Sequence, residues 1–280
     1  MVAKKRRIEG RLELATEFDT DFVDNGYFHK KGNKKLNMKA EAFYIPKDNK
    51  DRPQGEDSHF ICREKLTIGV ADGVGGWARK GIDAGEYARE LMTNSVIALQ
   101  DEEKGNVNPR SVLQEAYSNT NVKGSSTACI ITLSSNNCLH YVNLGDSGFM
   151  LFRDKKCIHK SVVQQHGFNC PYQLGTRCRD LPCMAYEEKI DVEAGDIIVA
   201  GTDGMLDNIY PSEIMEILAK TDEKKQMFAE ELAETIAEWA LFNALDEDYV
   251  SPFARAAEMA GYSHSGGKYD DITVIVCQIE

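Results

Sequence analysis

Acidic side chains adjoin apolar, strand-like segments at four separate places in the sequence. Residues 66–71 form a short apolar run with β-branched residues, and this run ends at Asp72, which a glycine-rich loop follows. The glycines let the backbone turn tightly and approach a bound group closely. The three other acids, placed next to residues 139–144, 196–202 and 272–276, are Asp146, Asp203 and Asp270.

Carboxylates that gather at one rim of a sheet repel each other, unless divalent cations neutralise them. A set of ligands made only of oxygen atoms favours magnesium or manganese over zinc. An Asp-Gly step taken alone is more simply a turn. The fourfold recurrence therefore favours a metal site over four unrelated turns.

The segments around these acids resemble those of a known family, the metal-dependent serine/threonine protein phosphatases, or protein phosphatase type 2C (PPM family). The resemblance runs from about residue 50 to the C-terminus, and its motifs occur in the family's order, at residues 70–76, 143–148, 201–208 and 268–274. Four ordered motifs are much more specific than one. Further segments are similar to the organellar branch of this family, at residues 73–77, 123–130, 164–166 and 251–253.

The resemblance implies a metal-dependent protein-serine/threonine phosphatase, a phosphoric monoester hydrolase with two Mn²⁺ or Mg²⁺ ions and a phosphoprotein substrate. A water activated by both metals would hydrolyse phosphoserine or phosphothreonine without a phosphoenzyme. Asp72 would bridge the metals, the carbonyl of Gly73 would bind the second, and Asp203 and Asp270 would hold the first. Asp146 would help to hold a third, weaker metal, or it is a turn aspartate that caps its own backbone.

Three further positions before and within the motifs bear on the chemistry. The resemblance implies that Arg52 binds the substrate phosphate, because a guanidinium can donate two hydrogen bonds to it. Without the resemblance, Arg52 is equally well interpreted as a solvated loop arginine. Glu56 and Asp57 would orient metal-bound waters, or they sit in a turn. Val74 replaces a histidine that many members use to protonate the leaving oxygen, so a metal-bound water would have to act as general acid.

The choice between Asp270 and Asp271 rests on the family's Asp-Asn-x-Thr pattern. Asp270 fills the first place of that pattern, and Asp271 departs from it by replacing the asparagine.

Hydrophobic periodicity predicts mixed strands and helices, and the resemblance implies an α+β fold with two antiparallel β-sheets packed as a sandwich and helices on the outer faces. Residues 1–50 are expected to be a partly irregular extension and residues 51–280 the phosphatase domain. Successive strands across residues 126–159 predict an antiparallel meander. Helix starts are expected after Asp83, Asn108 and Ser251, and a helix over residues 224–244 would pack through Phe228, Leu232, Ile236 and Trp239.

The bulk composition limits the possible partners and compartments. A formal charge of −12 argues against nucleic-acid binding, and no apolar run is long enough to span a membrane. The eight cysteines contain no Cys-x-x-Cys pair and are expected to be reduced thiols in an intracellular protein. A redox role stays open for Cys170, Cys178 and Cys183, which lie in a long segment over residues 160–188.

The resemblance suggests a mitochondrial or plastid location, although no transit peptide is visible, and a monomer is expected. The basic run at residues 4–7 leaves cytoplasm or nucleus as the alternative.

Two rival functions remain. A catalytically weak pseudophosphatase would act as a protein-binding module, and a haloacid-dehalogenase-type phosphatase would use Asp19 and Asp21.

Overall fold

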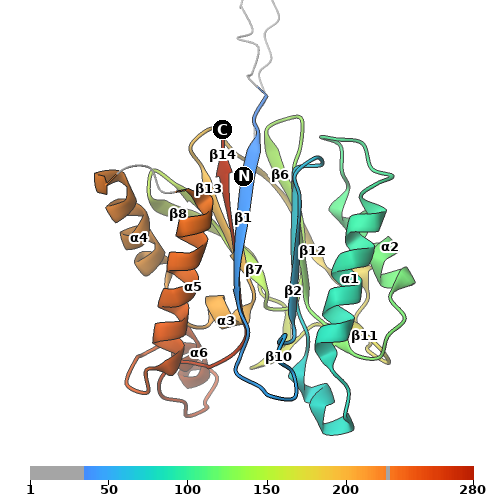
Figure 1. The fold of residues 1–280 in the computed structure, drawn as a ribbon, viewed down its shortest axis with the longest axis vertical. Helices are drawn as coiled ribbons and strands as arrows, with labels where there is room; N and C mark the ends of the chain where they lie inside the picture. Colours follow the sequence, from blue (N-terminus) through green and yellow to red (C-terminus); the bar gives the residue numbers. More distant parts are fainter. Residues whose placement is uncertain (1–34, 225–227) are drawn as a thin grey trace, which may run out of the picture. The chain divides into compact units, whose positions relative to one another are not determined.

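The computed structural model describes residues 35–224 and 228–280, and the compact unit runs over Lys35–Glu280. Two five-stranded antiparallel sheets form its centre (Figure 1). Sheet I has the order β1 (Met38–Ile45), β14 (Ile272–Ile279), β13 (Ile197–Gly201), β7 (Gly148–Arg153) and β8 (Lys156–Lys160). Sheet II has the order β12 (Tyr186–Asp191), β6 (Cys138–Leu144), β5 (Ala128–Leu133), β3 (Thr67–Asp72) and β2 (Asp57–Cys62).

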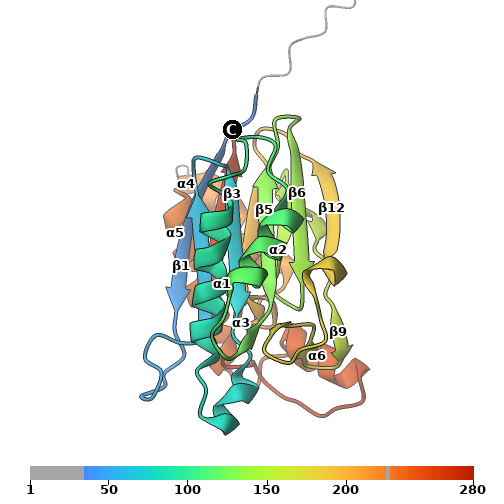
Figure 2. The same cartoon turned by 90° about the vertical axis from the view of Figure 1, so that its right-hand side faces the viewer.

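Helices cover the outer face of each sheet, as Figures 1 and 2 show. Sheet II is covered by α1 (Ala84–Ala98) and α2 (Pro109–Asn119), and sheet I by α4 (Pro211–Lys224) and α5 (Ala229–Leu245). The short helices are η1 (Gly75–Lys80), η2 (Pro182–Met184), α3 (Asp203–Leu206) and α6 (Pro252–Met259). Two small ribbons pair β4 (Ser125–Ser126) with β11 (Leu174–Gly175) and β9 (Gln165–Gly167) with β10 (Cys170–Pro171). The expected sandwich with outer helices is confirmed.

Both faces of the central strands are buried, which explains their unbroken apolar sequence. In β3, Ile68 and Val70 pack between the two sheets, whereas Ala71 faces the helical layer of α1. In β5, Ile131 points to the inter-sheet core and Ile130 to the helices. Successive strand residues point to opposite faces, so most positions of a strand that is covered on both sides are apolar.

Local signals place the helix starts where the sequence predicts them. The Asp83 carboxylate accepts a hydrogen bond from the Gly85 amide at 2.9 Å and caps α1. The Asn108 side chain accepts one from the Arg110 amide at 3.0 Å, and Pro109 is the first residue of α2. Each cap pairs a backbone N–H that has no partner inside the helix.

The buried stripe of α5 differs from the prediction. Leu232 and Ile236 are buried, but Phe228 and Trp239 have exposed fractions of 76% and 38%. Small alanines take their place against sheet I, because the helix lies close to β1 and β14.

Two further expectations about the chain path are corrected. The compact unit begins at Lys35 rather than at residue 51, because β1 pairs along its whole length with β14. The predicted meander is wrong. The hairpin of β5 and β6 belongs to sheet II, while β7 pairs with β13 and β8 in sheet I. The chain therefore crosses between the sheets at residues 145–147.

Candidate metal centre

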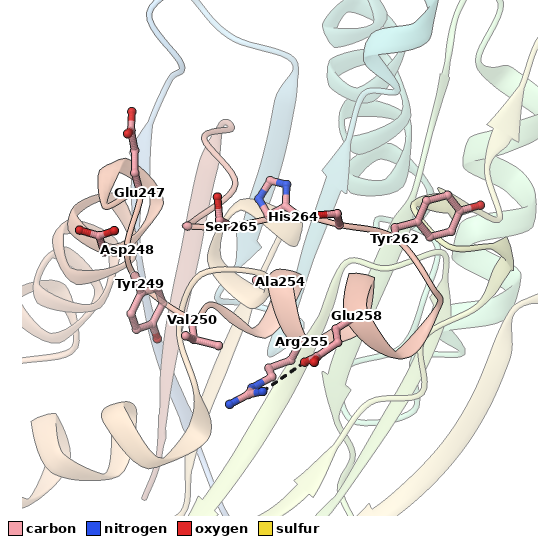
Figure 3. Close-up of a pocket in the computed structure, with 12 residues that line it drawn as sticks. Glu247, Asp248, Tyr249, Val250, Ala254, Arg255, Glu258, Tyr262, His264 and Ser265 are labelled. Atoms are coloured by element: carbon pink, nitrogen blue, oxygen red, sulfur yellow. Dashed lines mark hydrogen bonds and ion pairs between the residues drawn. The ribbon is translucent and has the colours of Figure 1, made fainter.

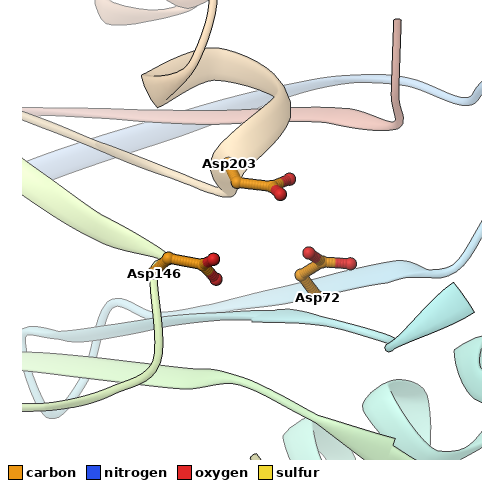
Figure 4. A group of neighbouring side chains, drawn as sticks. All are labelled: Asp72, Asp146 and Asp203. Carbon is orange, nitrogen blue, oxygen red and sulfur yellow. The ribbon is translucent and has the colours of Figure 1, made fainter. Parts of the chain in front are cut away.

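Three carboxylates from distant parts of the chain converge at one end of the sandwich. Asp72 is the last residue of β3, Asp203 is the first residue of α3 after β13, and Asp146 lies in the crossover between the sheets. One oxygen of each lies within 4.8 Å of the others. The three side chains point toward a common centre in Figure 4. Asp146 owes its place to the crossover, which leads the chain from β6 of sheet II to β7 of sheet I.

The backbone beside Asp72 is held too tightly for any residue but glycine at position 73. The Gly73 amide donates to the Glu56 carbonyl at 3.0 Å. A Cβ atom on Gly73 would lie 2.7 Å from the Ala84 and Glu56 carbonyl oxygens. The Asp72 amide donates to the Thr127 hydroxyl at 3.0 Å, which fixes the neighbouring peptide as well. The Asp-Gly step therefore has a defined geometry and is not a free surface turn.

Asp270 and Asp271 have different surroundings. The Asp271 carboxylate accepts hydrogen bonds from the Lys47 amide at 2.8 Å, the Glu56 amide at 3.0 Å and the Tyr44 hydroxyl at 3.1 Å. Asp270 instead lies near Lys268, whose Nζ is 3.8 Å from its carboxylate. Asp271 thus joins three segments of the fold, and Asp270 is the member of the pair that faces the acidic cluster.

Asp57 connects the two sheets beside this cluster. One oxygen of its carboxylate accepts hydrogen bonds from the hydroxyls of Thr202 and Thr273, both at 2.7 Å. Asp57 belongs to sheet II, Thr273 to sheet I, and Thr202 immediately precedes Asp203. The sequence analysis gave neither threonine a role. Thr273 could have been found, because it fills the threonine position of the Asp-Asn-x-Thr pattern.

Crowding of these acids shifts their ionisation in the metal-free protein. Burial, with the carboxylates of Asp203, Asp57 and Asp270, raises the pKa of Asp72 well above its usual value. Burial and Asp203 raise the pKa of Asp146 to about 7, and burial and Asp203 raise that of Asp270 to about 6. Each shift means that negative charge at this end of the sandwich needs a positive partner.

The cluster has the chemistry of a divalent-cation site. Its groups are carboxylate oxygens, which are hard donors suited to Mg²⁺ or Mn²⁺. Among the described residues, one buried carboxylate oxygen each of Asp57, Asp146 and Asp203 has no hydrogen-bond partner. A buried charged oxygen without a partner is costly, and a cation in the cluster would pair the oxygens of Asp146 and Asp203. The residues present therefore fit the metals that the sequence predicts.

Lys268 is a cationic residue of the site that sequence reasoning missed. Its Nζ bonds the Asp203 carboxylate and lies 2.8 Å from the Asp207 carboxylate. Burial alone would lower the pKa of Lys268, but Asp203, Asp207 and Asp270 together raise it well above its ordinary value. Its position two residues before Asp270 was the available sequence signal.

Arg52 lies beside the site but is paired within the protein. Its guanidinium donates to the Glu56 carboxylate at 2.5 Å and to the Ile82 carbonyl at 3.0 Å. The side chain has an exposed fraction of 15%, so it is not the solvated loop arginine of the alternative interpretation. Val74 lines a neighbouring hollow together with Trp77, Lys80 and Cys178.

A second hollow opens next to the site, between α6 and the segment that leads to Lys268. It has a volume of about 510 Å³, and its acidic side chains are Glu247, Asp248 and Glu258. Figure 3 shows Arg255 directed at Glu258, and the two groups form an ion pair at 3.2 Å. The hollow is therefore lined by three acidic side chains and one arginine, among neutral residues.

All eight cysteines are free thiols in the structure. Cys170 and Cys183 are exposed and Cys178 is half-buried. A redox role for these three stays a prediction.

Asp19, Asp21 and the basic run at residues 4–7 lie outside the described residues. In the described part of the chain, no helix has the length and apolar character needed to cross a membrane.

Comparisons with known proteins agree with this fold. The family model described as Stage II sporulation protein E (SpoIIE) matches residues 63–280. "Probable protein phosphatase 2C 55" of Arabidopsis thaliana is 48% identical, over 88% of this chain and 52% of that protein. "Protein phosphatase PTC7 homolog fig" of Drosophila grimshawi is 39% identical, over 81% of this chain and 80% of that protein. The X-ray structure of the photosystem II phosphatase PBCP has a TM-score of 0.80 and 30% identity, covering 87% of this chain and 99% of that one.

A two-sheet sandwich with acids at one end is thus the fold of the metal-dependent protein phosphatases. The chain belongs to the protein phosphatase 2C (PPM) family, which confirms the resemblance seen in the sequence. It spans about half the length of the Arabidopsis relative.

Proposed function

We propose that this chain is a metal-dependent protein-serine/threonine phosphatase that removes phosphate from phosphoproteins. The observation that supports it most directly is the convergence of Asp72, Asp146 and Asp203 within 4.8 Å, where Asp146 and Asp203 each have a buried oxygen without a partner. The relatives from Arabidopsis thaliana and Drosophila grimshawi both carry the name protein phosphatase. A mitochondrial or plastid location and a monomeric state stay predictions that rest on the resemblance.

Named residues would hold two Mn²⁺ or Mg²⁺ ions. Asp72 and the Gly73 carbonyl come from the end of β3, Asp203 follows the end of β13, and Asp270 precedes the start of β14. When bound, two such ions supply Lewis-acid activation of a water nucleophile and charge neutralisation, with no phosphoenzyme. Asp57 fixes Thr202 and Thr273, so it holds the two sheets, and with them the ligands, in register.

The remaining residues act on the substrate. We assign Arg52 to the phosphate group, because its guanidinium lies beside the site and Glu56 holds it in place. Val74 has no ionisable group, so it does not supply the proton for the leaving oxygen. A pseudophosphatase is the second candidate, but no metal-ligand position assigned above has lost its acidic group.

The test is hydrolysis of a phosphothreonine peptide with Mn²⁺, with Mg²⁺ and with chelator. We expect Asp203→Asn to lower kcat by more than about 100-fold, since loss of even an outer partner of a metal ligand costs about 10- to 100-fold. Asp154→Asn, on the exposed turn between β7 and β8, is the matched control and should retain full activity. Arg52→Ala should raise KM and leave Mn²⁺ binding unchanged.

Each failure has a distinct meaning. Mn²⁺ binding without turnover on any phosphopeptide would favour the pseudophosphatase. Turnover that persists in chelator and in Asp203→Asn would refute the assigned site.

A further inference from the structure

Lys268 holds two carboxylates that would otherwise be free to bind metal. Its Nζ bonds the Asp203 carboxylate and lies 2.8 Å from that of Asp207. Asp203 is also one of the three acids that converge at the candidate centre. Asp207 lies one helical turn further along, on the same side of α3 and its continuation. Asp203 and Asp207 could therefore bind a further cation beside the metal site, and the Lys268 ammonium group occupies that position.

The backbone of Lys268 is fixed by a clamp. The Lys268 amide donates to the Asn208 side-chain oxygen at 2.8 Å, and the Asn208 side-chain nitrogen donates to the Lys268 carbonyl at 2.7 Å. Asn208 is fully buried and also donates to the Gly204 carbonyl at 2.8 Å. One asparagine thus joins Lys268 to the helix that carries Asp203 and Asp207.

The ammonium group is also shielded from solvent. The Lys268 side chain has an exposed fraction of 15%. Its Nζ lies 5.2 Å from the centre of the Phe253 ring, a distance at which an aromatic face attracts a cation. Phe253 is in turn held by its amide, which donates to the Asp207 carbonyl at 3.1 Å. These contacts hold the Lys268 ammonium group in a defined, largely buried position.

We propose that Lys268 is a resident cation that occupies the Asp203–Asp207 pair and so denies it to a third metal ion. The inference rests on the proposed metal site. Asp146, Asp203 and Asp207 would offer a further divalent cation three carboxylates, but that cation would meet the ammonium charge at short range. The chain then binds two divalent cations firmly, and the third, weaker metal implied by the resemblance is replaced by Lys268.

The test counts Mn²⁺ ions bound to the full chain, by equilibrium dialysis with metal analysis and by calorimetry. Wild type should bind two ions at millimolar free Mn²⁺. Lys268→Met removes the charge while keeping most of the side-chain volume, and it should bind a third ion at least tenfold more tightly than wild type does. Lys268→Arg keeps the charge and should return the count to two.

Two further variants separate this role from a merely structural one. Lys189→Met, on the exposed side of β12, is the matched loss of a lysine and should still bind two ions. Lys268→Met combined with Asp207→Asn lacks one carboxylate of the pair and should lose the third ion. Asp207→Asn alone, with Lys268 unchanged, should still bind two ions.

The outcomes distinguish this inference from the proposed function. Two ions in both wild type and Lys268→Met, with equal affinities, would overturn the inference alone. So would a third ion in wild type that Asp207→Asn removes. A wild type that binds no Mn²⁺ would overturn the proposed metal site, and the role of Lys268 with it.

Discussion

At the scale of the residue, the neighbouring acids Asp270 and Asp271 should have separable roles. Asp271 accepts hydrogen bonds from Tyr44, Lys47 and Glu56, whereas Asp270 faces the cluster. We expect Asp270→Asn to weaken Mn²⁺ binding with little change in stability. Asp271→Asn should lower the free energy of unfolding by about 1–3 kcal/mol, because an NH₂ group replaces one carboxylate oxygen and cannot accept the hydrogen bond of the donor that faces it. Calorimetric Mn²⁺ titration and urea denaturation measure the two effects.

If Asp271→Asn instead abolishes Mn²⁺ binding and Asp270→Asn lowers stability, then Asp271 is the metal ligand and Asp270 the structural residue. The family's asparagine at the second place can accept hydrogen bonds but carries no charge, which is consistent with a structural role for Asp271.

At the scale of the element, α3 must lie directly against the start of β14 for the site to form. A Cβ atom on Gly204 would lie 1.9 Å from the Asp271 carbonyl oxygen. Gly204→Ala should therefore push α3 away from β14 and separate Asp203 from Asp270. We expect a loss of stability of about 1–3 kcal/mol, as for other overpacked sites, together with weaker Mn²⁺ binding. Thermal unfolding with and without Mn²⁺ measures both.

Gly167→Ala is the control for this substitution, because no atom lies within 4 Å of the added Cβ. It should leave both quantities unchanged. Equal melting temperatures and equal Mn²⁺ affinities for Gly204→Ala and wild type would show that the contact between α3 and β14 does not set the site.

At the scale of the whole molecule, the acidic cluster should make the metal-free protein less stable as the pH rises. Burial raises the pKa of Asp146 to about 7 and those of Asp207 and Asp270 to about 6, from an ordinary value of 3.8. A carboxyl whose folded-state pKa is raised stabilises the fold at low pH, and this contribution is lost as the pH passes the folded-state value. The melting temperature of resin-treated, metal-free protein should fall between pH 5 and about pH 8.

Excess Mn²⁺ should restore the melting temperature at the upper end of this range, and Asp146→Asn should flatten the dependence. His59 acts in the opposite direction, because burial lowers its pKa and it destabilises the fold when protonated. A metal-free melting temperature that rises over the same range would mean that the carboxylates do not repel each other as described.

The sequence by itself determined the features that depend on neighbouring residues. Apolar runs predicted the central strands, because strands that are covered on both faces are apolar at most positions. Asp83 and Asn108 predicted helix starts, because capping joins a side chain to backbone groups two or three residues away. Acids beside four strands predicted the metal site, and the resemblance supplied the arrangement of the sheets.

Only the tertiary structure decided which distant segments meet. The sequence does not show that the chain changes sheets at Asp146, since hairpins and crossovers can have equally short connections. Asp57 and Thr273 are separated by 216 positions, yet their hydrogen bond joins the two sheets. The contact of Lys268 with Asp207 likewise depends on how the start of β14 packs against α3. Such pairs are selected by the burial of whole sheets and helices, and their own residue types specify no partner.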